Sequence, residues 1–324
     1  MALLSALFVV AALVGAWSFG LFGGRQGGQG SQAANGRAGQ EAGKPKSIAV
    51  EAKTVGKVGS GSGGEAASVE VKTGLQKYSW AEIKAIAEEI EACASSEEAL
   101  ELARNYNLID SSGNVRSDTK EVGLSDGTTM HMRVVGVWHD KADTASGRAG
   151  LTFLSDGIVM RHSLDGAGTI DGGWEASGMR SWLAGDVWGM MPAEVSSLIV
   201  PAYKLTNNVG NTRTLDCISE TKDLLWIPSI VELSGPVDWE YQSNPANNGL
   251  YNSIFNAEGS QYLAFAQKSI ISYSSNSVLS LGQDWWLRST SPATGRGRYV
   301  SSDGDPSCYI EANLEKGVVV GFCL

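Results

Sequence analysis

The sequence predicts an α+β domain over residues 78–324, because helical and strand patterns are both short and long loops separate them. At its start, Ser79–Glu82 has the order of a capping box, and apolar residues recur at helical spacing over residues 80–90. From Met130 the run MHMRVVGVWHD changes to the alternation of a strand. Helices are therefore expected to open the domain, and a sheet is expected to follow.

The remaining elements are also expected to be short. A second capping box at Ser95–Glu98 predicts a second helix, so that residues 78–110 form the helical opening. Further strands are expected at residues 150–153 and in the closing runs RYVSSDG and KGVVVGFCL. Two more short helices are expected at residues 177–183 and 192–200, the second with a proline at its start.

The first 77 residues have a different character from the rest. Ala2–Phe22 holds no charge over 21 residues, which matches the roughly 20 residues that cross a bilayer and exceeds the roughly 7–15 apolar residues of a cleaved signal. Residues 1–23 are therefore predicted to be a transmembrane helix or signal anchor. Residues 24–77 are rich in Gly, Ser and Gln and are predicted to be a disordered linker.

Two rules bear on the orientation of this predicted span. Arg25 follows it and favours a cytoplasmic position for the C-terminal side, whereas large domains translocate largely regardless of such charges. We expect a single-pass protein of the cell membrane, in contact with the bilayer through residues 2–22, with its folded domain outside the cell.

Charge and cysteine content exclude several classes of protein. The net charge is −10, and residues 1–77 carry eight Lys/Arg against four Asp/Glu, so the folded part carries −14. An acidic domain lacks the basic surface that binds nucleic acid. The four cysteines form no C-x-x-C pair, so no zinc site is expected, and no cofactor is predicted. Cys308 and Cys323 are the pair that we would test first for a disulfide.

The motifs that resemble catalytic or metal sites favour structural interpretations. Gly123–Gly127 matches G-x-S-x-G, but it precedes a strand and contains turn residues, so a turn is favoured over a nucleophile elbow. His139 and Asp140 could form a base and its orienting carboxylate, although a structural pair is favoured. Ser302–Asp305 lacks the calcium-binding pattern of an EF-hand. No catalytic or metal-binding residue is predicted.

A tryptophan-rich run, D-W-W-L-R-S, leads into a loop that is rich in Gly, Arg and Ser. Neighbouring residues of a strand face opposite sides, so one of Trp285 and Trp286 is expected in the core and the other at the surface. Arg288 is expected to pair with a buried carboxylate as part of the frame. Arg296 and Arg298 lie in the loop and are candidates for ligand recognition.

Several of these motifs together are similar to those of a bacterial domain family of unknown function. The match covers residues 78–324, with Thr290 where that family has Pro and without its closing Arg. The matching runs are YSWAEI at 78–83, LSDG at 124–127, VGVWHD at 135–140, GGW at 172–174, SGMR at 177–180, WIPS at 226–229 with Glu232, EGSQY at 258–262 and WWLRS at 285–289.

That family resembles the C-type-lectin-type fold that formylglycine-generating enzymes share with the variable proteins of diversity-generating retroelements. The resemblance implies that ligand-binding side chains are displayed after a tryptophan-rich strand, and Trp286 joins them as a ring that can stack on a ligand. The cysteines do not match those of the enzyme, so that activity is not implied. The display positions carried onto this sequence are Ala293, Thr294, Arg296, Arg298, Tyr299, Ser301, Asp303 and Asp305.

The sequence therefore predicts a membrane-tethered binding domain on the cell surface, which recognises an unknown protein or glycan through its C-terminal loop region. Two alternatives remain open. One is a secreted hydrolase that acts on envelope polymers, and the other is a structural envelope protein without a ligand.

Overall fold

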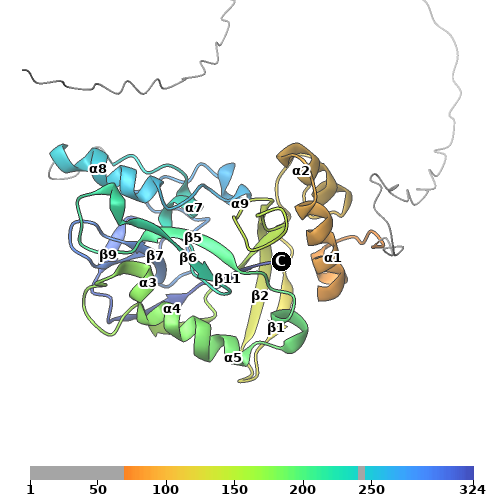
Figure 1. Ribbon diagram of the computed structural model, residues 1–324, viewed down its shortest axis with the longest axis horizontal. Helices are drawn as coiled ribbons and strands as arrows, with labels where there is room; N and C mark the ends of the chain where they lie inside the picture. Colours follow the sequence, from red (N-terminus) through yellow and green to blue (C-terminus); the bar gives the residue numbers. More distant parts are fainter. Residues whose placement is uncertain (1–68, 240–244) are drawn as a thin grey trace, which may run out of the picture. The chain divides into compact units, whose positions relative to one another are not determined.

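The computed structural model describes residues 69–239 and 245–324 (Figure 1). The membrane segment predicted at residues 1–23 and most of the predicted linker lie outside the described residues. Among the residues that are described, no helix is both long and apolar enough to cross a bilayer. Short helices and short strands alternate along this part of the chain, so the α+β prediction is confirmed.

The helical opening forms as its capping signals predict. Helices α1 (Trp80–Glu91) and α2 (Ser96–Asn105) begin after Ser79 and Ser95, and both caps accept a hydrogen bond from the backbone N–H three residues later. The apolar residues of α1 that recur at helical spacing are the ones that are buried. Ordered structure starts earlier than the predicted boundary at Tyr78, because Leu75 in a short 3₁₀ turn, η1 (Leu75–Lys77), is buried and its N–H donates to Asp118.

The first sheet has four antiparallel strands in the order β1-β2-β3-β11: Lys120–Gly123, Thr129–Val137, Leu151–Ser155 and Gly321–Cys323. The C-terminal strand therefore pairs with a strand far away in the sequence. Gly123–Gly127 leads from β1 into the turn before β2, as predicted. Helix α1 packs so closely against the start of β3 that a Cβ on Gly150 would lie 1.9 Å from the Ala87 carbonyl oxygen.

The second sheet has five strands in the order β4-β10-β7-β8-β9: Met160–Ser163, Glu315–Val318, Trp285–Thr290, Gly297–Val300 and Cys308–Ile310. Its central strand, β7, pairs in parallel with β10 and antiparallel with β8, and all six of its residues are buried. A separate two-stranded ribbon joins β5 (Ala202–Asn207) to β6 (Ile218–Asp223). This ribbon was not predicted from the sequence.

Short helices fill the connections between these strands. The helix expected at 177–183 runs further, because a π-helical segment, η2 (Leu183–Val187), joins α4 to α5, and the helix expected at 192–200 ends at Ser196. Figure 1 shows α7, α8 and α9 together on one side of the β5–β6 ribbon and α3 to α5 on the other. These helices are α3 (Gly173–Ala176), α4 (Gly178–Trp182), α5 (Trp188–Met190), α6 (Ala193–Ser196), α7 (Ile230–Ser234), α8 (Pro245–Asn256) and α9 (Leu263–Ala266), with a 3₁₀ turn η3 (Leu215–Cys217).

Two apolar clusters form the core, and β7 contributes one tryptophan to each. Trp286 belongs to the cluster beneath α1 and the first sheet, whereas Trp285 belongs to the cluster around α7, Phe255 and α9. All four cysteines are free, so the Cys308–Cys323 disulfide is not formed. Cys323 is buried instead, with its Sγ 3.6 Å from the Thr152 hydroxyl.

Candidate functional site

Strand β7 turns both tryptophans of the signature run into the interior. Trp286 is 0% exposed and Trp285 is 3% exposed. The expectation that one of them reaches the surface is wrong, because β7 is a central strand with both faces covered. The two neighbouring tryptophans point to opposite faces of the sheet, and each face packs against a different apolar cluster. The Trp286 indole N–H donates to the His162 carbonyl at 3.0 Å. Trp286 is therefore part of the frame beneath the predicted ligand surface.

Arg298 also lies in the interior, with 6% of its surface exposed. Its guanidinium carbon lies 4.6 Å from the Trp239 ring, 4.9 Å from Phe255 and 5.0 Å from Tyr309, and it donates to the Ser307 carbonyl. Arg298 was predicted to lie in a loop, but it belongs to strand β8 and is covered by aromatic rings. The outermost ring, that of Tyr309, is 47% exposed.

The acidic residues among the predicted positions hold a turn together. Asp303 accepts hydrogen bonds from the hydroxyls of Ser275 and Ser301, which lower its pKa. Asp305 accepts from the Ser307 hydroxyl at 2.7 Å, and its own N–H donates to Ser301 at 3.0 Å. Within the described ranges, no group of three or more His, Cys, Asp or Glu side chains could hold a metal ion.

The remaining predicted positions reach solvent. Ala293 is exposed, and Thr294, Arg296 and Tyr299 are half-buried. Arg296 forms an ion pair of 2.7 Å with Glu311 at the surface, and Tyr299 rests on the Lys316 ammonium, 3.9 Å from its ring centre. We call Thr294, Arg296, Tyr299 and Tyr309 the C-terminal surface.

Beneath this surface, Arg288 is the centre of a buried polar network. Its side chain is fully buried, and each edge of the guanidinium has partners. Two nitrogens grip the Glu232 carboxylate, one of them at 2.9 Å. The same two nitrogens also donate to the carbonyls of Ile227 and Glu258 at 3.1 Å each, and Nε donates to the Thr206 hydroxyl at 3.0 Å. The expectation that Arg288 pairs with a buried carboxylate is confirmed.

Lys204 extends the network from Glu232 towards the first sheet. Its ammonium donates to Glu232 at 3.1 Å, to the Tyr262 hydroxyl at 2.8 Å and to Asp140, and it lies 4.2 Å from the Trp226 ring centre. Asp140 in turn accepts from the Thr152 hydroxyl of β3 at 2.6 Å. All three protons of the buried ammonium are therefore used.

Glu258 is the third carboxyl in this interior. Burial raises its pKa to about 7, against the opposing influence of Arg288 and of hydrogen bonds from Ser289 and from the Asn207 N–H. Burial would also raise the pKa of Glu232, but Arg288 and Lys204 outweigh it and hold that pKa at about 2. Lys204 and Arg288 therefore keep Glu232 ionised, while Glu258 exchanges its proton near neutral pH.

A cavity of about 110 Å³ opens beside the network and reaches Glu258, Glu232 and Arg288. At the cavity, His139 lies 4.8 Å from the Tyr262 ring, and its Nε2 lies 3.4 Å from the hydroxyl oxygen of Ser260. His139 and Asp140 do not act as a pair, because Asp140 is engaged by Lys204 and Thr152. Perturbed carboxyls in a cleft are typical of functional sites, although ion networks of purely structural value also produce them.

The network joins residues that lie far apart in the sequence. Most of these residues fall within the part of the chain that a known family model matches. A family described as a domain of unknown function, DUF6273, matches residues 149–324, which is more than half of the chain. The chain belongs to this family. No curated protein and no solved structure matches the chain. The DUF6273 match includes Lys204, Glu232, Glu258 and Arg288, whereas Asp140 and His139 lie before it.

Three residues of this DUF6273 domain were missed as chemically important, namely Lys204, Glu258 and Ser260. Lys204 alternates with Ala202 and Thr206 on the buried face of β5, but only the fold shows which face of that run is buried. Glu258 and Ser260 were noticed only as part of the run EGSQY. A carboxyl flanked by small residues, Ala257 and Gly259, gives no sign of its burial.

Replacing Arg288 should destabilise the DUF6273 domain strongly. Arg288→Met leaves Glu232 buried with Lys204 as its only cation, and removing one partner of a buried ion pair costs about 3–5 kcal/mol. Urea unfolding of Arg288→Met and of Arg296→Met measures the contrast. The exposed Arg296–Glu311 pair should be worth less than about 1 kcal/mol, so equal effects of the two substitutions would contradict this account.

The pKa of Glu258 predicts how stability depends on pH. Its folded value of about 7 lies above the ordinary value of 4.5, so the folded state binds the extra proton between these two pH values. The unfolding free energy should fall as the pH rises from 4.5 to 7, by about 1.4 kcal/mol per unit and about 3 kcal/mol in all, and should then level off.

Glu258→Gln is the matched control for this dependence, because the amide keeps the shape of the carboxyl and cannot ionise. Urea midpoints measured at intervals between pH 4.5 and 8 should show a slope in the wild type that is absent from the variant. The same slope in both proteins would assign the dependence to other groups.

Proposed function

We propose that residues 69–324 form a binding domain of C-type-lectin-type architecture, held at the outer face of the cell membrane by residues 2–22. In this proposal the ligand is a protein or a glycan outside the cell, and the C-terminal surface contacts it. The finding that supports the proposal best is the arrangement of Tyr309, a ring that is 47% exposed and backed by the buried guanidinium of Arg298.

An exposed ring whose inner face packs against a buried side chain is suited to ligand binding. Tyrosine offers a large apolar face with a polar tip, and fixing it in advance lowers the conformational entropy that binding would cost. Tyr309 lies on β9, an edge strand, paired across to Arg298 of β8. The ring therefore stands at a fixed position on the rim of the sheet.

Arg296 adds a charged group to this surface. Its partner Glu311 is also partly exposed, with side-chain exposures of 41% for Arg296 and 44% for Glu311. Such a solvent-exposed ion pair is weak enough to exchange for a ligand carboxylate or hydroxyl at little cost. Arginine and tyrosine are both enriched among the residues that dominate binding energy at interfaces. Beneath them, the fully buried strand β7 and its Arg288 network supply a rigid base.

The proposal is tested by removing these two side chains without disturbing the base. A glycan array and a library of displayed peptides are probed with the wild-type domain and with the double variant Arg296→Ala, Tyr309→Ala. Binding to the selected ligand should weaken at least about ten-fold, because the largest exposed contacts are lost. The control is Arg148→Ala, an exposed arginine stacked on Trp138 at the far end of β2, which should bind as the wild type does.

Binding that the double variant retains in full would exclude the C-terminal surface. Failure of the wild type to select any glycan or peptide would count against the binding function itself.

One observation favours a second function, that of a hydrolase. The Ser260 hydroxyl and the His139 ring lie 3.4 Å apart beside the polar cavity, which is the arrangement of a nucleophile and its base, slightly longer than in an engaged site. Ser260 is exposed and could be reached by a substrate, and Glu258 could exchange protons near neutral pH. In this function His139 would take the proton of Ser260 as the hydroxyl attacks.

A fluorophosphonate probe tests the second function directly, because an activated serine displaces its fluoride and becomes covalently labelled. The hydrolase predicts labelling at Ser260 that is lost in His139→Gln while the protein stays folded. Absence of labelling in the wild type, or labelling that His139→Gln leaves unchanged, would exclude it.

A further inference from the structure

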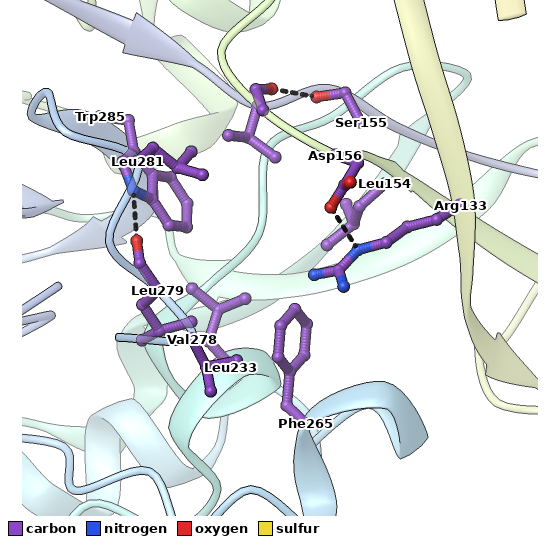
Figure 2. Close-up of a pocket in the computed structure, with 12 residues that line it drawn as sticks. Arg133, Leu154, Ser155, Asp156, Leu233, Phe265, Val278, Leu279, Leu281 and Trp285 are labelled. Atoms are coloured by element: carbon purple, nitrogen blue, oxygen red, sulfur yellow. Dashed lines mark hydrogen bonds and ion pairs between the residues drawn. The ribbon is translucent and has the colours of Figure 1, made fainter. Parts of the chain in front are cut away.

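A second cavity, of about 70 Å³, lies at the edge of the apolar cluster around α7 and α9 and shares no lining residue with the cavity beside His139. Figure 2 shows its walls converging from β2, β3, α7, α9 and the segment that leads into β7. The Trp285 indole N–H is satisfied by the Leu279 carbonyl at 3.1 Å, so that wall presents only its apolar ring. Other apolar walls include Leu154, Leu233, Phe265, Leu281 and Val319, and Ser155 and Asp156 line the polar side.

A single cation points into this apolar space. Arg133 leaves strand β2, and Figure 2 shows its guanidinium directed into the cavity above the Phe265 ring, 5.2 Å from the ring centre. Its Nε lies 3.3 Å from an Asp156 carboxylate oxygen, close enough for an ion pair but not aligned for a hydrogen bond. Burial lowers the pKa of Arg133 even though Asp156 opposes this.

Contacts within the protein account for only part of the Arg133 side chain. The face of the guanidinium rests on Phe265, and the Nε edge faces Asp156. The two terminal nitrogens, Nη1 and Nη2, have no hydrogen-bond partner among the residues that the structure describes. Arg288 in the same domain shows the contrast, since all of its nitrogens are used within protein. Of the Arg133 nitrogens, only Nε is fully buried without a hydrogen-bond partner among the described residues. With 22% of the side chain exposed, the terminal nitrogens reach the opening of the cavity, where an incoming acceptor can meet them.

We infer that this cavity binds a carboxylate that carries a short aliphatic group. The two terminal nitrogens of an arginine form a planar fork that matches the two oxygens of a carboxylate. The aliphatic group would then fill the space between Leu233, Leu281 and Trp285. This site lies apart from the C-terminal surface and does not depend on the function proposed for that surface.

The size of the cavity limits the ligand. Pockets for drug-sized molecules measure roughly 300–1,000 Å³, whereas this one holds about 70 Å³. That is enough for a few heavy atoms, so a branched chain of three or four carbons fits and a long acyl chain or an aromatic acid does not. A free short-chain acid and the C-terminal aliphatic residue of a peptide share this chemistry.

Asp156 gives the proposal a distinctive signature. Its carboxylate is about half exposed and sits at the same guanidinium, so it repels an incoming carboxylate. Removing its charge should therefore strengthen binding, whereas a purely structural Arg133–Asp156 pair would lose stability and gain no affinity.

The experiment titrates the full-length chain with isobutyrate and, separately, with N-acetylvaline, by isothermal titration calorimetry. Saturable binding of at least one probe is expected in the wild type. Affinity should fall at least ten-fold in Arg133→Leu and rise several-fold in Asp156→Asn. Arg148→Leu, which removes an arginine stacked on a ring outside the cavity, should change nothing. Stronger binding of N-acetylvaline would identify a peptide end as the source, and stronger binding of isobutyrate would identify a free acid.

The neutral amide isobutyramide provides a test that needs no variant, since it has the same shape without the charge and should not bind. Equal binding of isobutyramide and isobutyrate, unchanged affinity in Arg133→Leu, or no saturable binding of either acid would overturn the proposal. If Arg133→Leu does not fold, the amide comparison and Asp156→Asn decide the question.

Discussion

The structure depends on one buried chain of charges, Asp140–Lys204–Glu232–Arg288, because it is where three separate sheets meet. Thr152 connects the chain to the first sheet, Lys204 and Thr206 belong to the β5–β6 ribbon, and Arg288 belongs to β7 at the centre of the second sheet. Charges removed from water need partners at close distance and correct angle. A network with every member satisfied therefore specifies how the sheets are placed, which apolar contacts alone would do less sharply.

This constraint also shapes what the surface can do. Arg288 bonds β7 to the buried network, and the two tryptophans pack into the core on both faces of this strand. The polypeptide that follows β7 therefore returns to the surface from a fixed position. The C-terminal surface is fixed in turn, because Arg298 lies on β8, which pairs with β7, and its guanidinium packs against the Tyr309 ring. At the other end of the same network, Glu258 reaches a cavity with a pKa of about 7, so a change of pH near neutrality alters the charge beside His139.

The sequence predicted those parts of the fold that local patterns encode. The five buried positions of α1, the caps at Ser79 and Ser95, the β1–β2 turn and the pairing of Arg288 with a buried carboxylate all follow from spacing or from the chemistry of one side chain. The β5–β6 ribbon was missed because its run, AYKLTN, places a lysine and a threonine on the buried face, against the usual alternation.

The predicted ligand residues show the limit of such reasoning more clearly. The run R-G-R-Y suggested an exposed loop, but Arg298 is buried among aromatic rings that come from residues 239, 255 and 309. Nothing in the neighbouring sequence reveals those contacts. In the same way, alternation predicted that one of Trp285 and Trp286 lies at the surface, and only the pairing of β7 between β10 and β8 shows that both faces are covered.

The most direct test of the central claim is a double-mutant cycle between Asp140→Asn and Glu232→Gln, read as free energies of unfolding in urea. Both carboxylates accept from Lys204, and the network model of the fold requires their effects to be coupled. The account predicts a coupling energy of at least about 1 kcal/mol. Free energies that add to within about 0.3 kcal/mol would show that the charges act independently and would contradict it.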